Sequence, residues 1–289
     1  MSISVLMLKL LLAPALVVAS SLAGRRWGPA PAGTLVALPI VAGPILGIAC
    51  LEHGPGFTAR AAGASLLGLV SLALFTVLFA MLSRVRRTAH WTVTLLLAWA
   101  GCLVADFTLS LLSVPPLVAL CLSLAATACG VKALSRIDAD PDADPGSDVM
   151  PTAPPSPPWD LPARAAATAL LVTALTTTAA QLGPDMTGVL APFPIGTSVV
   201  ATFALAQGGP VVAVATLRGV LRGLWGFAAF CFLVAVLAEP LGGGGAFAAA
   251  VTCTLALQLG LGRLHSMRTT RRTAYATRAV HATHAVQER

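Results

Sequence analysis

Long stretches of apolar residues, separated by short polar or charged turns, follow one another along almost the whole chain. Each stretch is close to the roughly 20 residues with which a helix crosses the hydrocarbon core of a bilayer. The runs are too long and too continuous for the strands of a membrane barrel. The pattern therefore predicts an all-α polytopic transmembrane bundle of about nine helices, at residues 3–23, 31–51, 60–82, 91–112, 114–134, 161–182, 187–207, 212–237 and 243–262.

The composition supports a membrane protein. Of the 289 residues, 57% are hydrophobic and 10% are charged, and the mean hydropathy is +0.86. A soluble domain carries about 25% charged residues. The six cysteines lie within or at the ends of apolar runs, without a C-x-x-C pair, which is typical of packing residues rather than of disulfides or zinc ligands. We expect no metal and no cofactor.

The positive charge is distributed unevenly between the two sides of the predicted bundle. With the N-terminus outside, Lys9 and Arg60 are the only lysine or arginine residues on the outer side, and all others fall in or near cytoplasmic segments. This bias sets membrane orientation, so the net charge of +7 needs no nucleic-acid partner. Abundant Ala, Gly, Pro and Arg indicate a GC-rich bacterial genome. We therefore predict a bacterial inner-membrane protein with a cytoplasmic C-terminus.

Two polar segments interrupt the apolar pattern. Residues 136–160 are rich in proline and aspartate and predict a disordered acidic cytoplasmic linker. The DADPDAD motif within them resembles a calcium loop only faintly, because Ala143 and Val149 occupy the positions that need Gly and Glu. Residues 263–289 form a basic cytoplasmic tail, which either lies on anionic lipid headgroups or extends freely.

An internal similarity divides the chain into two halves. Residues 28–40, GPAPAGTLVALPI, and residues 183–195, GPDMTGVLAPFPI, share six of thirteen positions. The same offset of 155 pairs Gly54-Pro55 with Gly209-Pro210 and Phe75 with Phe230. Matched prolines and glycines favour a duplication. The alternative is that two apolar helices with similar turns resemble each other through composition alone.

The duplication hypothesis predicts the organisation of the chain. A first four-helix repeat would occupy residues 1–112 and a second would occupy 161–262, with a linking transmembrane helix at 113–135 before the acidic linker. Five crossings separate the starts of the two repeats, so the repeats would be inverted. Inverted repeats about an axis in the membrane plane are a common plan of secondary transporters.

The second half also resembles a known family. Gly188, then Phe193-Pro194, a helix, a short turn and the aromatic-rich region 225–232 follow the pattern of the GlpM-like family of small inner-membrane proteins. The first half has Leu38-Pro39 in place of Phe-Pro. The resemblance covers about fifty residues per half. It implies a duplicated and fused member of a poorly characterised family, with no catalytic residues to transfer.

Prolines in corresponding spans are the first candidates for a solute site. Pro39 and Pro194 interrupt the second and seventh predicted helices, and Thr197 and Ser198 place hydroxyls beside the second break. Paired interruptions point to a binding site near the bilayer midplane, because freed backbone carbonyls need a partner. The alternative is a pair of packing kinks.

Three charged residues are the other candidates. Arg218 and Arg222 share a helix face, where they would either attract an anionic solute or act only as topology charges. Asp106 lies within the fourth span, where an acid would bind a proton or another cation, or pair with Lys9.

No enzyme signature occurs: H-E-x-x-H, G-x-S-x-G and a phosphate-binding P-loop are all missing. The leading hypothesis is a secondary transporter that moves a small solute by alternating access. The rival is a non-transporting accessory or scaffold in envelope or polysaccharide assembly. Small-residue faces allow a homodimer, although the same faces serve packing within one chain.

Overall fold

The structure, a computed structural model, is built from α-helices throughout the part of the chain that it describes, which is residues 3–37, 42–85, 90–112, 114–138, 157–182 and 193–287. Some side chains within the helices lie outside the described residues, among them those of residues 3–10, 175–182 and 258–287. The helices are α1 (Ile3–Trp27), α2 (Pro29–Val36), α3 (Ala42–His53), α4 (Pro55–Val85), α5 (Trp91–Ser110), α6 (Pro116–Asp138), α7 (Asp160–Leu182) and α9 (Ile195–Gln287).

Proline residues mark several helix starts. Pro29, Pro55 and Pro116 each occupy the first position of a helix, where the missing N–H is not needed and the fixed φ suits the helical turn. Among the described residues, four helices are long and apolar enough to cross a membrane: α4, α5, α6 and α9. The fold is therefore compatible with an integral membrane protein. The predicted all-α class is confirmed for the described residues. The predicted number of nine helices is not established.

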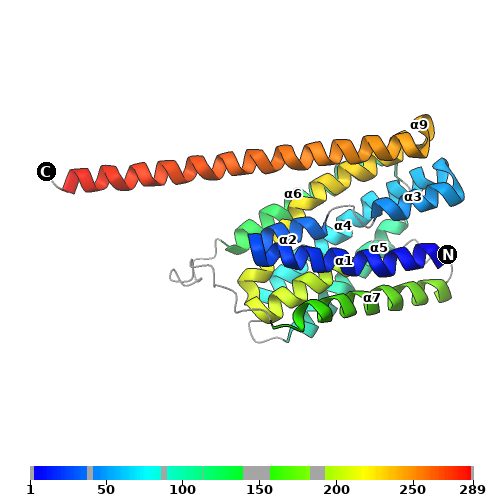
Figure 1. Cartoon of the computed structure of the whole chain (residues 1–289), viewed down its shortest axis with the longest axis horizontal. Helices are drawn as coiled ribbons and strands as arrows, with labels where there is room; N and C mark the ends of the chain where they lie inside the picture. Colours follow the sequence, from blue (N-terminus) through cyan, green and yellow to red (C-terminus); the bar gives the residue numbers. More distant parts are fainter. Residues whose placement is uncertain are drawn as a thin grey trace.

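Two glycines divide α9 into three segments. Gly209 has φ 74° and Gly242 has φ 67°, so the helix axis breaks at both. We call residues 195–208, 210–241 and 243–287 the first, second and third segments of α9. Figure 1 shows the chain turning back after the second segment, and the third segment running along the bundle and past it to the C-terminus.

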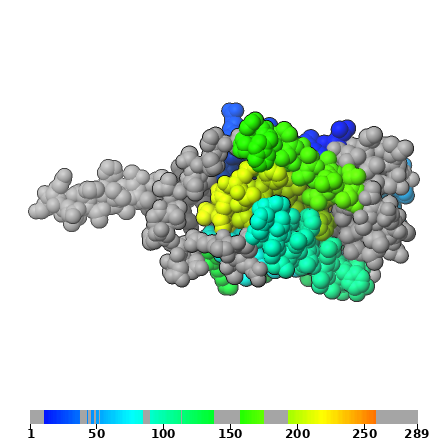
Figure 2. Space-filling model, turned by 90° about the horizontal axis from the view of Figure 1, so that it is seen from below, coloured from blue at the N-terminus to red at the C-terminus, as the bar shows by residue number. Residues whose placement is uncertain are grey.

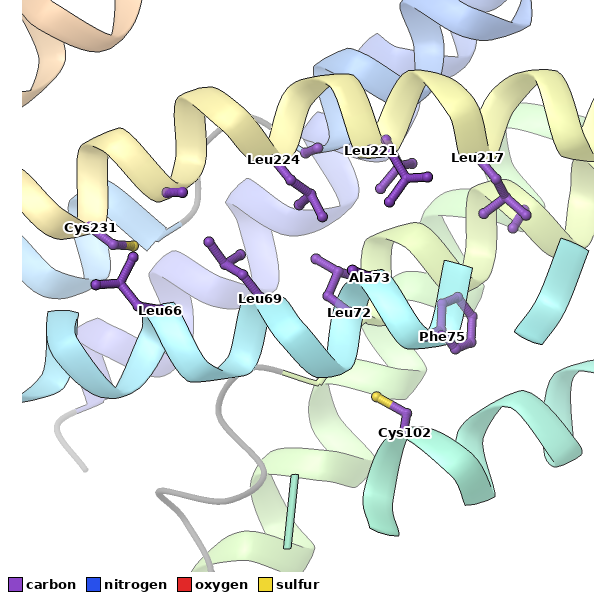
Figure 3. Packing of buried hydrophobic residues seen from close by; sticks show 14 of the residues in the cluster. Leu66, Leu69, Leu72, Ala73, Phe75, Cys102, Leu217, Leu221, Leu224 and Cys231 are labelled. Carbon is purple, nitrogen blue, oxygen red and sulfur yellow. The ribbon is translucent and has the colours of Figure 1, made fainter. Parts of the chain in front are cut away.

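The centre of the bundle is formed by α4 and the second segment of α9. Leu66, Leu69 and Phe75 of α4 are buried against Leu221 and Leu224 of α9. In Figure 3 the residue numbers rise in opposite directions along the two helices, so the helices are antiparallel. On the face shown in Figure 2, α9 lies between α7 and α5.

A close backbone contact fixes α2 against the same segment of α9. A Cβ atom added at Gly33 would collide with the backbone of Thr216 and Val220, and one at Gly219 would collide with the backbone of Ala30. Thr34 Oγ1 also lies 3.0 Å from the carbonyl oxygen of Gly219, to which it donates. We call this contact the glycine seam. Small residues allow such approach in membrane helices.

The predicted span at 31–51 was wrong as a single helix. The chain forms two separate helices there, α2 and α3, and residues 38–41 between them, which include Pro39, lie outside the described residues. The helix-start preference of Pro29 and the glycine seam favour a short first helix. α6 continues to Asp138 and α7 begins at Asp160, and residues 139–156 of the predicted acidic linker lie outside the described residues. The predicted repeat boundaries stay a prediction.

Candidate functional site

Asp106, the acid among the predicted candidates, is buried, with 4% of its surface exposed. It accepts a hydrogen bond at Oδ1 from the hydroxyl of Ser71 on α4. Cys102, one turn earlier on α5, places its Sγ 3.7 Å from Oδ2. The Ser71 hydroxyl is also 2.9 Å from the carbonyl oxygen of Gly68. The carboxyl group therefore sits among neutral donors, inside the bundle.

The sequence of α5 explains why Asp106 faces inward. Thr94, Ala98, Cys102 and Asp106 are the buried residues of this helix, and they recur every four positions on one face. Large apolar side chains on the other faces are exposed, namely Leu96, Leu97, Leu103, Val104 and Phe107. This arrangement suits a helix with a lipid-facing perimeter and a polar stripe toward its neighbours.

A second polar contact joins the same face of α5 to α9. Trp99 donates its indole N–H to Ser198 Oγ at 2.8 Å, and its ring centroid lies 5.3 Å from that of Phe193. Ser198 and Thr197 are buried in the first turn of α9. Trp99 precedes Asp106 by seven residues, about 10 Å along the helix. Ser198, one of the two predicted hydroxyls, and Asp106, the predicted acid, thus lie along one side of α5.

Pro194 is buried and comes directly before α9. Its carbonyl oxygen accepts a hydrogen bond from the backbone N–H of Ser198 at 2.8 Å. The carbonyl therefore has a partner within the first helical turn. Residues 183–192, which would show whether a helix also precedes this proline, lie outside the described residues, as does its predicted counterpart Pro39.

The two arginines of the second segment have different surroundings. Arg218 is half-buried and donates from Nη2 to the carbonyl oxygen of Leu134 on α6, at 3.4 Å. Arg222 is exposed. Both Arg222 and Arg84, at the end of α4, lie within electrostatic range of Arg218. This concentration of positive charge fits the topology interpretation as readily as the anion-binding one.

A polar network that sequence reasoning missed joins α1, α7 and α9. Asp160, the first residue of α7, accepts hydrogen bonds from Arg25 and Arg164, each at 2.9 Å, and from Gln207 at 2.6 Å. Arg164 also donates to Gln207 Oε1 at 3.2 Å. The guanidinium of Arg164 lies 4.7 Å from the ring centroid of Phe203, a cation–π distance. We call Arg25, Asp160, Arg164 and Gln207 the ionic network.

Electrostatics favour the ionised form of Asp160 despite its burial. Burial alone would raise the pKa of Asp160, but hydrogen bonds from Gln207, Arg25 and Arg164 outweigh it and hold the pKa below its ordinary value. In the sequence, Asp160 is the last residue of the predicted linker, and the positive-inside bias accounts for Arg25 and Arg164 as topology charges. The i, i+4 spacing of Asp160 and Arg164 at a helix start was the available signal.

Comparisons with protein-family models, with curated proteins and with solved structures find no match to this chain. The GlpM-like resemblance therefore stays a prediction. The function has to be inferred from the geometry.

Proposed function

We propose that this protein is a secondary carrier of a small solute, working by alternating access between two inverted halves. The proposal depends on one observation above all. The helices α4 and the second segment of α9 are antiparallel neighbours, and their buried positions match at a constant offset of 155. Two similar units in opposite orientations provide two states of similar energy, open to opposite sides of a membrane.

The match in burial extends along the whole of α4. From Thr58 to Ser83, every buried residue except Leu72 has a buried residue 155 positions later, between Ala213 and Ala238. Phe75 and Phe230 are both fully enclosed, at 0% and 1% exposure. Buried residues recur with the same helical period in any two amphipathic helices. They need not coincide residue by residue when the helices are aligned at the offset of 155, which comes from the match of residues 28–40 with 183–195. This agreement supports the duplication.

The first helices of the two halves support the same offset. Val17 of α1 and Val172 of α7 are 155 positions apart, and both are buried. These two helices pack against each other. Both halves also carry a glycine with positive φ before a proline, Gly54-Pro55 and Gly209-Pro210. In a carrier that arose by duplication, we expect helix breaks at corresponding positions of the two halves.

In this proposal, the ionic network closes one side of the carrier. It joins α1 of the first half to α7 and α9 of the second, so opening between the halves on that side has to separate Arg25 from Asp160. With the predicted orientation, this is the cytoplasmic side, and the structure would correspond to an inward-closed state. The polar contacts of α5, from Trp99 to Asp106, would line the path between the halves.

The test is accessibility measured from both sides. In a variant with all six cysteines replaced by alanine, Ser198→Cys in the first turn of α9 reports on the proposed path. Thr252→Cys, exposed on the third segment, is the matched control. We expect labelling of Ser198→Cys by a membrane-impermeant maleimide to change with a proton gradient, while the control stays constant. Adding Asp160→Asn should increase labelling from the cytoplasmic side. Invariant labelling in both backgrounds would contradict the carrier.

A second candidate function is a membrane scaffold, and the third segment of α9 favours it. This segment runs past the bundle to the C-terminus, as a docking element would. Deleting residues 263–289 discriminates between the two functions. A scaffold should lose its assembly with partners on truncation, whereas a carrier should keep its gradient-dependent labelling.

A further inference from the structure

We propose that Asp106 and Ser71 form a reversible proton-binding site in the interior of the bundle, built to hold either protonation state without moving a helix. In the carrier proposed above, a proton would then be the coupling ion. This coupling rests on the proposed function, but the proton site itself does not.

The site rests on one hydroxyl that faces two acceptors. Ser71 Oγ lies within hydrogen-bond distance of Asp106 Oδ1 and of the carbonyl oxygen of Gly68. A serine hydroxyl has a single proton, so it can donate to only one of the two at a time. The acceptor that does not receive the Ser71 proton needs another donor, or it has to be satisfied without Ser71.

Protonated Asp106 satisfies both contacts. The carboxylic O–H donates to Ser71 Oγ, and the Ser71 O–H donates to the carbonyl oxygen of Gly68, so every donor has an acceptor. When the proton leaves for solvent, the Ser71 hydroxyl rotates and donates to the carboxylate. The thiol of Cys102 can donate weakly to Oδ2 in this state. The Gly68 carbonyl keeps its bond within the helix, so the exchange needs only one hydroxyl rotation.

The surroundings favour a proton over a metal cation. Calcium takes six to eight oxygen ligands, and magnesium requires octahedral oxygen coordination. Among the described side chains, the polar partners of Asp106 are a single hydroxyl and a thiol, which is a soft ligand. Cys102 belongs to the same buried hydrophobic cluster as Leu72, Ala73 and Phe75, whose side chains offer no oxygen. A proton needs no further ligand, and it removes a charge that is costly to bury.

Among the described side chains, no permanent positive charge forms an ion pair with Asp106. On α4, Arg60 and Arg84 are eleven and thirteen residues from Ser71, roughly 16 and 20 Å along the helix axis. On α9, Arg218 donates to Leu134 and Arg222 is exposed. Cys102 is the titratable side chain in contact with Asp106 in the described part of the chain. The proton occupancy of Asp106 is therefore set mainly by its own neighbours and by solvent.

Infrared difference spectroscopy on the full chain in lipid tests the site without a known solute. We expect a carboxylic-acid carbonyl band that disappears as the pH rises and that is missing from Asp106→Asn. Ser71→Ala removes a donor to the ionised form, so the band should persist to a pH higher by about one unit. Ser83→Ala is the matched control, because Ser83 is also buried on α4 and bonds the carbonyl three residues earlier. It should leave the midpoint unchanged.

Two results would overturn the proton site. One is a band that does not titrate, or that survives in folded Asp106→Asn protein, with folding checked by circular dichroism and gel filtration. The other is an equal midpoint for Ser71→Ala and Ser83→Ala. Gradient-dependent labelling without titration would leave the carrier standing and remove only the site. Titration of the band together with invariant cysteine labelling would leave the proton site standing and remove the carrier.

Discussion

Gly54 and Gly209 both have a positive φ, 83° and 74°, and each is followed by a proline that opens a helical segment. A side chain at such a φ places Cβ close to the carbonyl oxygen, at a cost of roughly 1–2 kcal/mol. The space around both glycines is open, because an added Cβ would meet nothing within 4 Å. Backbone strain alone therefore sets the cost of substitution.

This relationship predicts equal penalties at two distant positions. Gly54→Ala and Gly209→Ala should each lower the free energy of unfolding by about 1–2 kcal/mol. Gly63→Ala, within α4 and also free of steric conflict, should instead stabilise by about 0.5–1 kcal/mol, because alanine favours a helix interior. Thermal unfolding in detergent would compare the three. A neutral Gly209→Ala would show that the break in α9 does not require glycine.

The glycine seam predicts a different kind of penalty, from collision rather than strain. Gly219→Ala should force α2 away from α9, because its Cβ would overlap the backbone of Ala30, which cannot rotate aside. We expect a loss of about 1–3 kcal/mol, the usual range for overpacking. Gly47→Ala on α3, which has open space, is the control. The same unfolding measurement decides, and equal stabilities would contradict the close contact.

The ionic network predicts a pH-dependent stability. Since the folded-state pKa of Asp160 lies below the unfolded value of about 3.9, its contribution is present above that value. It is lost as the pH falls through the folded pKa. Asp160→Asn should cost roughly 3 kcal/mol at neutral pH, because two arginines lose their anionic partner. The difference from the wild type should shrink in acid. Glu239→Gln, at an exposed position, should change stability by less than about 0.5 kcal/mol.

The duplication predicts a matching pair at the opposite end of the bundle. Arg164 donates a hydrogen bond to Gln207. At the offset of 155, Arg164 corresponds to Lys9 and Gln207 corresponds to Glu52. The side chains of Lys9 and Glu52 are not among those described. We expect Lys9→Gln and Glu52→Gln to be non-additive by about 1 kcal/mol in a double-mutant cycle. Lys9→Gln and Asp106→Asn should be additive. Coupling of Lys9 to Asp106 would instead support the pairing considered from the sequence.

Local patterns predicted the helices well, because apolar run length and proline position act within a few residues. The burial of Asp106 followed from its position in an apolar run. Its hydrogen bond with Ser71 could not be predicted, because that contact depends on the rotation of α4 against α5. The ionic network was missed for the same reason, since Arg25 and Asp160 are 135 residues apart. The span at 31–51 failed because hydropathy does not register the end of α2 at Val36 within an otherwise apolar stretch.

The glycine seam has a mechanical consequence. Interdigitated side chains can change rotamer when two helices slide past each other. Backbone atoms in direct contact cannot rotate out of the way. We therefore expect α2 and the second segment of α9, one from each proposed half, to resist sliding past each other, although 185 residues separate Thr34 from its acceptor Gly219. Any rocking of the two halves would then have to pivot about this contact.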